Sequence, residues 1–432
     1  MTPAARLAAA IEVLAAIETQ RRPAAVALKA WGLAHRFAGS GDRAAIAGLV
    51  YDALRRRASS AFLMGDDTAR GIVLGMLKRE RELDTEAIAR LADGSKYGPA
   101  ELSADERKRL DDGSISDAAP YIAGDYPEWL DSHFERSFGD MRAEEGAALA
   151  SRAPLDLRVN ALKAEPAAAA AMLADLKPEL TRWSPWGLRI RLSADARNPA
   201  IHAEPAFLKG LIEVQDEGSQ LAALFTGAKP GEQVLDLCAG AGGKTLALAA
   251  MMENKGQIFA TDDDKRRLAP IHERLKRSGA RNVQVRTPKS IGGEIADLAG
   301  RMDLVLIDAP CTGTGAWRRN PDAKWRMRPG ALDQRITEQA EILDRAATLL
   351  KPGGRIAYVT CSVLDSENGA QVKAFLARNG DFSLQAPARV AEVLGDRALV
   401  FGKTARLSNE GILMTPRTTD TDGFFVSLMK RR

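Results

Sequence analysis

The chain has 432 residues, 45% of them hydrophobic and 27% charged, and its 61 basic and 57 acidic residues leave a net charge of +4. This length predicts about two or three domains of an ordinary globular protein, and so small a charge does not by itself identify a nucleic-acid partner. The composition argues against a membrane or secreted protein, because no stretch approaches the roughly 18 apolar residues of a spanning helix and because Arg6 and Glu12 interrupt the apolar core that a signal peptide needs.

The first region, residues 1–120, is predicted to be a helical domain. Apolar residues recur at helical spacing over 4–17, 24–37, 42–54 and 68–77. Ser40 and Asp42 are candidate N-cap residues for the third of these helices, and we expect the run Arg55-Arg-Arg57 to be a solvated basic surface. The segment 111–120 is rich in turn-forming residues and is interpreted as a linker.

The second region, residues 126–227, is predicted to be a small α+β module. We expect a helix over 127–138, a strand over 155–160, an alanine-rich helix that begins at Pro166, and strands over 188–192 and 211–215. Nothing in the side chains of this region identifies a catalyst.

The third region, residues 228–432, alternates apolar strands with helices. Strands are expected at 233–237, 256–261, 282–286, 303–308 and 355–360. This rhythm is typical of right-handed crossovers in a doubly wound parallel sheet. A final strand over 424–429, joined by the turn Asp422-Gly423 to a preceding extended stretch, is expected to add to the sheet in an antiparallel hairpin.

All three cysteines lie just beyond the end of a predicted buried strand. Cys238 follows the first strand of the third region, Cys311 follows the fourth and Cys361 follows the fifth. Ligands bind at this edge of an open α/β sheet, although cysteine is also a small hydrophobe suited to strand ends, above all at Cys238. Because the cysteines are widely spaced and form no Cys-x-x-Cys pair, we expect a reducing cytoplasm and no metal site.

The loop after the first strand indicates the cofactor. The stretch Asp236-Leu-Cys-Ala-Gly-Ala-Gly-Gly-Lys-Thr245 matches neither a phosphate-binding Walker loop nor a dinucleotide fingerprint in full. Its glycines still allow close approach of a ligand to the backbone, and Asp262 at the end of the second strand is placed to bind ribose hydroxyls. An adenosine group without a polyphosphate fits this pairing, which predicts S-adenosylmethionine.

Two thiols and a carboxylate then suggest the reaction. Asp308-Ala-Pro-Cys311 and Thr360-Cys-Ser362 follow strands that we expect to be neighbours, so Cys311 and Cys361 should face each other. A thiolate that adds to carbon-6 of cytosine makes carbon-5 nucleophilic enough to accept a methyl group. Asp308 is placed to stabilise charge at ring nitrogen-3, and a second thiol can assist release. Spacing alone leaves open which cysteine attacks.

These motifs resemble the Nop/Sun-type RNA cytosine-5 methyltransferases, in particular their bacterial RsmB-like branch. The matching stretches span about half of the chain: Val214-Gln-Asp-Glu-Gly-Ser219, Leu237-Cys-Ala-Gly-Ala-Gly-Gly-Lys-Thr245, Asp308-Ala-Pro-Cys311, Asn320-Pro-Asp-Ala-Lys-Trp325, Thr360-Cys-Ser362 and Asp422-Gly-Phe-Phe425. The resemblance implies a class I S-adenosylmethionine-dependent methyltransferase with a Rossmann-like sheet, preceded by a NusB-like RNA-binding domain and an RNA-recognition-like subdomain.

The resemblance also implies roles for individual residues. Cys361 would attack the base and Cys311 would serve release. S-adenosylmethionine would contact Asp262, Asp308 and the loop residues Cys238, Ala239, Gly240, Ala241, Gly242, Gly243 and Lys244, with Lys244 near the target base. The family's aspartate after the third strand has no counterpart in Val285-Arg-Thr-Pro-Lys-Ser290, so adenine recognition differs here, and Ala241 stands where proline is commoner.

The implied substrate is a cytosine in 16S ribosomal RNA, and we expect a monomeric cytoplasmic enzyme. The segment Trp317–Arg328 holds five cations, one anion and two tryptophans. We interpret it as an RNA contact beside the catalytic turn, where cations meet phosphates and indoles stack on bases; the alternative is a loop whose tryptophans pack on the core. Transfer RNA is the competing substrate, and a non-catalytic assembly factor is disfavoured by the intact Cys311, Cys361 and Asp308.

Overall fold

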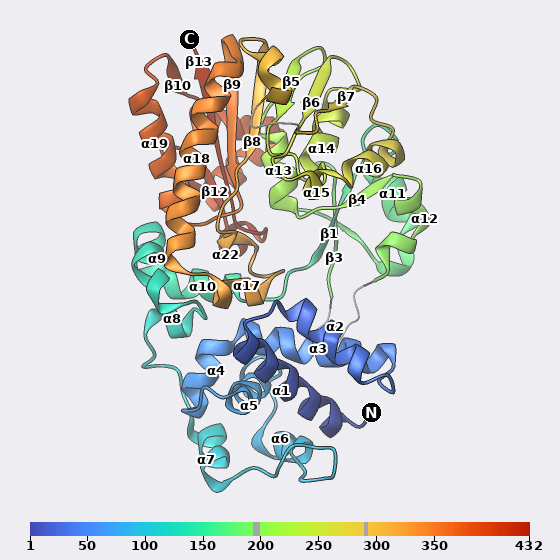
Figure 1. The fold of residues 1–432 in the computed structure, drawn as a ribbon, viewed down its shortest axis with the longest axis vertical. Coiled ribbons are helices and arrows are strands. Elements are labelled where there is room, and N and C mark those ends of the chain that lie inside the picture. The colour runs from blue at the N-terminus through green and yellow to red at the C-terminus, as the bar shows by residue number, and fades with distance from the viewer. Residues whose placement is uncertain (193–198, 289–292) are drawn as a thin grey trace. The chain divides into compact units, whose positions relative to one another are not determined.

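The structure, a computed structural model, describes residues 1–192, 199–288 and 293–432. It contains two compact units (Figure 1). The first includes Met1–Arg152 together with Trp317–Arg328. The second includes Ala153–Arg191, the described part of Asn198–Ala316, and Pro329–Arg432. The helices between residues 128 and 149, which the sequence analysis grouped with the second region, therefore lie in the first unit.

The first unit is helical, and the four helices expected near the N-terminus are all present. Its α-helices are α1 (Pro3–Gln20), α2 (Ala24–Ala34), α3 (Ser40–Arg55), α4 (Arg57–Met64), α5 (Ala69–Arg79), α6 (Thr85–Leu91), α7 (Ala104–Asp112), α8 (Pro120–Ala123), α9 (Asp131–Phe138), α10 (Arg142–Leu149) and α17 (Pro321–Arg326). Apolar faces of α1, α3 and α5 form the centre of its core, with Leu14, Val50 and Leu74 fully buried. The periodic pattern predicted these helices because each buries one apolar stripe.

Two local predictions in this unit are wrong. The N-cap of α3 is Gly39, and Asp42 lies inside the first turn, where its carboxylate accepts a hydrogen bond from the Gly39 N–H. Arg55 is not on a solvated surface: it is 8% exposed and donates to Asp52 at 3.0 Å. The Asp52 carboxylate and the Arg318 carbonyl accept hydrogen bonds from the guanidinium and compensate its loss of water.

The second unit begins with a four-stranded antiparallel sheet in the order β2-β3-β1-β4. Its strands are β1 (Leu155–Val159), β2 (Glu179–Leu180), β3 (Gly187–Ile190) and β4 (Ile212–Val214). The helices of this part are α11 (Pro166–Met172), which begins at the expected proline, α12 (Pro205–Leu208) and α13 (Glu217–Leu224). Strands and helices are thus present where the sequence predicted them beyond residue 153, in the same compact unit as the larger sheet.

The larger sheet has the order β11-β12-β13-β9-β8-β5-β6-β7, with β10 also paired to β13. Its strands are β5 (Gln233–Asp236), β6 (Gln257–Ala260), β7 (Val283–Val285), β8 (Met302–Asp308), β9 (Leu350–Thr360), β10 (Phe382–Leu384), β11 (Arg406–Leu407), β12 (Ile412–Met414) and β13 (Phe424–Arg431). The five strands from β5 to β9 are parallel, as expected. The strand order reverses between β5 and β8, so the chain has a topological switch point at their carboxyl ends.

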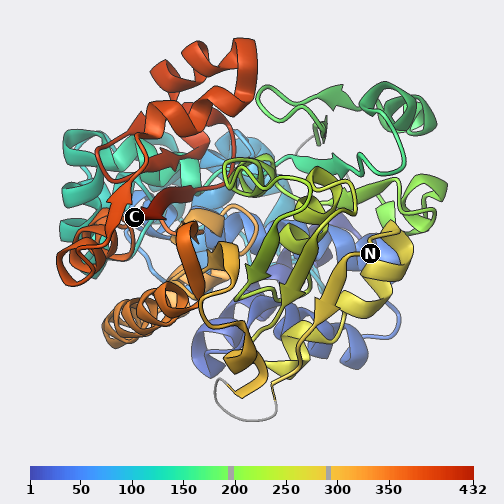
Figure 2. The same cartoon turned by 90° about the horizontal axis from the view of Figure 1, so that it is seen from above.

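Helices cover both faces of this sheet (Figure 2). They are α14 (Gly243–Met251), α15 (Lys265–Leu268), α16 (Ile271–Ser278), α18 (Pro329–Leu349), α19 (Gly369–Arg378), α20 (Pro387–Ala391), α21 (Ala398–Thr404) and α22 (Pro416–Thr419). Val234 and Leu306 pack on one face with α13, α14, α20 and α21, whereas Leu235 and Val305 pack on the other with α18 and α19. Successive side chains of a strand point to opposite faces of the sheet. Because helices cover both faces, the strands are apolar at nearly every position.

The C-terminal strand β13 pairs antiparallel with β9 and β12, so the expected antiparallel addition is confirmed. The connection differs from the prediction. Helix α22 lies between β12 and β13, so the residues directly before the Asp422-Gly423 turn are helical rather than extended. Thr415 caps α22 by accepting a hydrogen bond from the Thr418 N–H, which is the N-cap chemistry that a strand-based interpretation overlooked.

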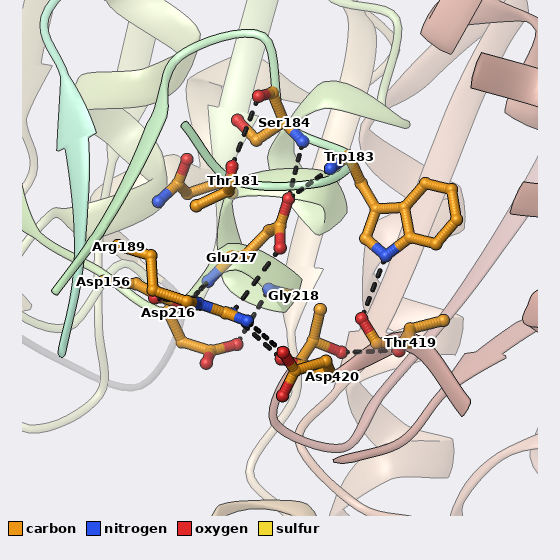
Figure 3. A network of polar contacts seen from close by, with 12 residues as sticks. Asp156, Thr181, Trp183, Ser184, Arg189, Asp216, Glu217, Gly218, Thr419 and Asp420 are labelled. Atoms are coloured by element: carbon orange, nitrogen blue, oxygen red, sulfur yellow. Dashed lines mark hydrogen bonds and ion pairs between the residues drawn. The ribbon is translucent and has the colours of Figure 1, made fainter. Parts of the chain in front are cut away.

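A buried polar network joins the small sheet to the chain between α22 and β13 (Figure 3). Arg189 on β3 donates to both carboxylate oxygens of Asp156, at 2.7 and 2.8 Å, and to the Asp420 carbonyl at 2.9 Å. Glu217 is fully buried and accepts hydrogen bonds from the Trp183 and Ser184 N–H groups. The acidic residues of the Val214–Ser219 stretch therefore serve the architecture of the second unit.

Candidate functional site

The two catalytic candidates among the cysteines are in direct contact. Cys361 follows the last residue of β9, and Cys311 lies three residues beyond β8, its parallel neighbour. Their sulfur atoms are 3.3 Å apart. The two thiols thus face each other, as the sequence predicted from adjacent strands.

The surroundings of Cys311 raise its pKa. The hydrogen bond to Cys361 and burial both raise the pKa of Cys311, and the charge of Glu367 adds to this effect. Cys311 is therefore held neutral in the free protein, where its thiol can donate a hydrogen bond to the Cys361 sulfur.

Asp308, three residues before Cys311, forms an ion pair with Lys244. The Lys244 Nζ lies 2.7 Å from Asp308 Oδ2, and the lysine is buried while the aspartate side chain remains 34% exposed. The ring of Phe424 lies 5.1 Å from the ammonium, which adds a cation–π contact. The structure thus brings together a residue of the glycine loop and a residue that ends β8. The exposed part of Asp308 leaves a carboxylate oxygen accessible to a substrate.

The glycine loop lies at the N-terminus of α14 and approaches Asp262. Gly240 and Gly242 adopt left-handed backbone angles, with φ of +51° and +84°. The Gly240 N–H donates to Asp262 Oδ2 at 2.9 Å, and the Asp264 N–H donates to Oδ1 at 2.9 Å. A Cβ at Gly240 would meet only the Asp262 carboxylate and the Arg267 guanidinium, so the backbone on this side is open to a ligand.

These residues fit S-adenosylmethionine. Each Asp262 oxygen retains capacity for a further hydrogen bond, as ribose hydroxyls require. The stretch after β7, where family members carry an adenine-contacting aspartate, is described only up to residue 288. The stretch Val285–Ser290, which lacks the family's aspartate, ends at residues 289 and 290, and these two lie outside the described residues.

A buried carboxylate in the same region was not among the predicted site residues. Asp236 ends β5, is fully buried and accepts a hydrogen bond from the Thr245 hydroxyl at 2.7 Å. Burial raises its pKa to about 7, and the neighbouring charges of Asp308 and Asp262 act in the same direction. Cys238, two residues later, packs partly buried against the sheet core, and burial raises the pKa of its thiol. The charges of Asp236, Asp308 and Asp262 act on this thiol in the same direction.

The segment Trp317–Arg328 does not present its tryptophans for base stacking, so that prediction is wrong. Trp317 is 1% exposed and stacks on Phe134, with ring centroids 5.9 Å apart. Trp325 packs on the helical core and donates from its indole N–H to the Leu54 carbonyl at 2.6 Å. The alternative interpretation, in which the tryptophans pack on the core, is the one that the structure bears out.

Lys324 in this segment is fully buried in the first unit. Its ammonium donates to the carbonyls of Arg55 and Asp125, at 2.9 and 2.6 Å. Burial lowers the pKa of Lys324 to about 7. A cation that the sequence assigned to phosphate contact is therefore a structural tie within the helical unit.

Comparison with known proteins identifies the family. The family described as 16S rRNA methyltransferase RsmB/F matches residues 223–430. A probable ribosomal RNA small subunit methyltransferase B from Synechocystis sp. is 31% identical over 323 residues, which cover 74% of this chain and 70% of that protein. Ribosomal RNA small subunit methyltransferase B from Klebsiella pneumoniae is 33% identical over 310 residues, which cover 71% of this chain and 66% of that protein. The chain belongs to the RsmB/F family.

Solved structures support the fold of this RsmB/F-family chain. The crystal structure of a protein designated PH0851 superposes with a TM-score of 0.70 at 24% identity, and the match covers 100% of this chain and 99% of that one. A methyltransferase homolog from Pyrococcus horikoshii gives a TM-score of 0.59 at 27% identity, over 74% of this chain and 100% of that one. The expected class I methyltransferase fold is thereby confirmed, and S-adenosylmethionine is the cofactor of this RNA methyltransferase family. Among the described residues, no helix is long and apolar enough to cross a membrane.

Proposed function

We propose that this protein transfers a methyl group from S-adenosylmethionine to carbon-5 of a cytosine in 16S ribosomal RNA, through a covalent bond between Cys361 and carbon-6. The observation that carries the proposal is the 3.3 Å contact between the Cys311 and Cys361 sulfurs at the carboxyl edge of β8 and β9. Two thiols in contact suit a reaction that needs one sulfur to form a bond to carbon and another group to complete release.

The attack step belongs to Cys361. Its thiolate bonds to carbon-6, and the electron pair of the carbon-5–carbon-6 double bond becomes available at carbon-5. When bound, S-adenosylmethionine would present an electrophilic methyl group to this electron pair, and the bond from methyl carbon to sulfur would break to leave S-adenosylhomocysteine. A neutral Cys311 supports the Cys361 thiolate by hydrogen bonding until the bond to carbon forms.

Release belongs to Cys311. The carbon-5 proton passes to a base, the electrons of that bond restore the double bond, and the bond between Cys361 sulfur and carbon-6 breaks to return a thiolate. Once Cys361 is bonded to carbon it carries no charge, so the main influence that raises the pKa of Cys311 is removed. Cys311 can then lose its own proton to solvent, and as a thiolate it accepts the carbon-5 proton.

Charge at the pyrimidine ring is balanced by Asp308 and Lys244. Addition of a thiolate at carbon-6 places negative charge on the ring, and a carboxyl group at nitrogen-3 stabilises it by donating a proton. The ammonium of Lys244 donates to Asp308 at 2.7 Å and holds that carboxyl group in place. Because Asp308 is partly exposed, it can reach the base while Lys244 stays buried.

Ribosomal RNA is favoured as the substrate because the similar Synechocystis and Klebsiella proteins bear the name of small-subunit rRNA methyltransferases. Transfer RNA is the alternative, with the same chemistry. Bisulfite sequencing of total RNA from cells with and without the protein decides between them: a protected cytosine that is lost from 16S RNA supports the proposal, whereas a loss confined to transfer RNA contradicts it.

The roles of the two thiols are tested by alanine variants. Cys361→Ala removes the nucleophile, so methyl transfer should vanish and no covalent adduct should form. Cys311→Ala permits attack and transfer but hinders loss of the carbon-5 proton, so enzyme should accumulate bound to methylated RNA. On a denaturing gel with labelled RNA, a slow band is expected for Cys311→Ala alone. A slow band for Cys361→Ala alone would exchange the roles, and no band for either would remove the covalent mechanism.

A further inference from the structure

Two buried polar side chains hold the backbone on both sides of Cys311. Glu367 ends the short 3-10 helix η7 (Asp365–Glu367) and is fully buried. Its carboxylate accepts hydrogen bonds from the Thr312 N–H at 2.8 Å and from the Thr312 hydroxyl at 2.5 Å. Gln339 on α18 donates to the Pro310 carbonyl at 2.9 Å. The residues immediately before and after Cys311 are therefore each fixed by a side chain.

The two side chains also contact each other. Gln339 is fully buried and donates to Glu367 Oε1 at 3.1 Å with the same amide nitrogen that binds Pro310. The hydroxyl of Tyr358 on β9 donates to the Glu367 carbonyl at 2.7 Å. A continuous set of contacts thus runs from the centre of β9 and from α18 to the Cys311 turn. We call Glu367, Gln339 and their bonds to residues 310 and 312 the Cys311 clamp.

The clamp occupies the part of the turn where no strand provides support. The Ala309 N–H donates to the Val359 carbonyl, and the Gly315 N–H donates to the Cys361 carbonyl, so both ends of the turn are tied to the β9 side. Between these points the backbone leaves the sheet, and Gly313 adopts a φ of +69°. Burial of a carboxylate is costly unless its hydrogen bonds are satisfied, and here three donors converge on Glu367.

We propose that Glu367 is a positioning residue for the reaction, and that the Cys311 clamp fixes the turn so that the Cys311 sulfur stays against Cys361. This inference rests on the proposed function, because it gives Glu367 a role in the release step that Cys311 performs. Glu367 is buried and its hydrogen bonds reach Thr312 rather than the thiols, so it positions Cys311 through the backbone, in addition to the effect of its charge, and does not touch the substrate.

The first test measures the thiols without any RNA. In Glu367→Ala the turn loses both hydrogen bonds of Thr312, and Gln339 loses a third. Cys311 should therefore become more accessible and react several-fold faster with iodoacetamide, as followed by mass spectrometry of the two cysteine peptides. Thr312→Val keeps the side-chain volume and removes one of those bonds, so a smaller increase in the same direction is expected. It also serves if Glu367→Ala does not fold. Unchanged Cys311 alkylation in the folded variants overturns the clamp.

The second test measures release. Glu367→Ala should accumulate a covalent RNA adduct, as expected for Cys311→Ala, because a displaced Cys311 cannot take the carbon-5 proton. Glu367→Gln keeps an acceptor oxygen for the Thr312 N–H and Gln339, and its amide NH2 can donate to the Thr312 hydroxyl, so it should restore most of the release. Glu341→Ala, at an exposed position on the same helix as Gln339, is the matched control and should show no adduct. An equal defect in the Gln and Ala variants would overturn positioning by hydrogen bonds.

The two tests separate this inference from the proposed function. Faster alkylation of Cys311 in Glu367→Ala, together with no adduct in Cys311→Ala, would support the clamp and contradict the covalent mechanism. An adduct in Cys311→Ala, together with normal alkylation and release in Glu367→Ala and Thr312→Val, would support the covalent mechanism and contradict the clamp.

Discussion

Individual residues around the cofactor loop show how one side chain can serve both fold and ligand. Asp262 accepts hydrogen bonds from the N–H groups of Gly240 and Asp264, so it shapes the loop that would hold the cofactor. Its neighbour Asp263 is 79% exposed and lies 3.7 Å from Arg345. Two adjacent carboxylates thus have opposite environments, which provides a matched comparison.

We expect Asp262→Ala to weaken binding of S-adenosylmethionine by about 1.5–3 kcal/mol, because hydrogen bonds to a charged group are lost from ribose and from the loop. Asp263→Ala should leave the affinity unchanged. Isothermal titration calorimetry measures both. Equal affinities in wild type and Asp262→Ala would show that Asp262 does not bind the ligand.

A second residue-scale prediction concerns Asp236. Its folded pKa of about 7 lies above the ordinary value of 3.8, so the folded state binds this proton more tightly than the unfolded chain. Its contribution to stability is therefore complete below about pH 4 and is lost as pH rises toward about 7, at about 1.4 kcal/mol per pH unit.

Asp236→Asn cannot ionise and should lack this dependence. The difference in unfolding free energy between wild type and variant, measured by urea titration at pH 5 and pH 8, should therefore shift in favour of the variant at the higher pH. A constant difference across that range would contradict a buried, protonatable Asp236.

At the scale of elements, the strands and the sheet edge could be predicted from the sequence, whereas the hydrogen-bond partners of polar side chains could not. Apolar runs followed by glycine or cysteine predicted β5, β8 and β9, and hence the contact between Cys311 and Cys361. Glu367 lies only six residues beyond Cys361, yet its partner Thr312 is 55 positions away in the chain. Such a contact depends on where η7 packs, and no local pattern encodes it. The same holds for Trp325, whose partner Leu54 is 271 positions away.

The ionic network of the small sheet leads to an element-scale prediction. Arg189 is almost fully buried against Asp156, and its removal leaves two buried carboxylates without their cation. Arg189→Met should destabilise the protein by about 3–5 kcal/mol. Arg191→Met, at an exposed pair with Glu179, should cost less than about 1 kcal/mol. Chemical denaturation measures the unfolding free energy of both variants. An equal loss in the two would show that the buried ion pairs stabilise the protein no more than the exposed pair does.

At the scale of the whole molecule, the first unit is completed by a distant part of the chain. Asp322 accepts a hydrogen bond from the Ala24 N–H, Trp325 donates to Leu54 and Lys324 donates to Arg55. Deletion of residues 1–152 should therefore expose apolar surface on 317–328 and make the remaining chain aggregate. Replacing 317–328 with a short glycine–serine linker in the same truncation should restore solubility. Light scattering of both preparations measures this, and a soluble simple truncation would contradict it.

The position of α17 in the first unit also bears on how the protein is synthesised. Residues 1–152 leave the ribosome first. The segment that supplies Trp317, Lys324 and Trp325 follows only after more than half of the second unit has been translated. Until then the nascent helical unit lacks the side chains that complete its apolar surface. The growing chain is thus exposed to aggregation or chaperone binding for as long as translation takes to reach Arg328, and only then can the first-made unit close.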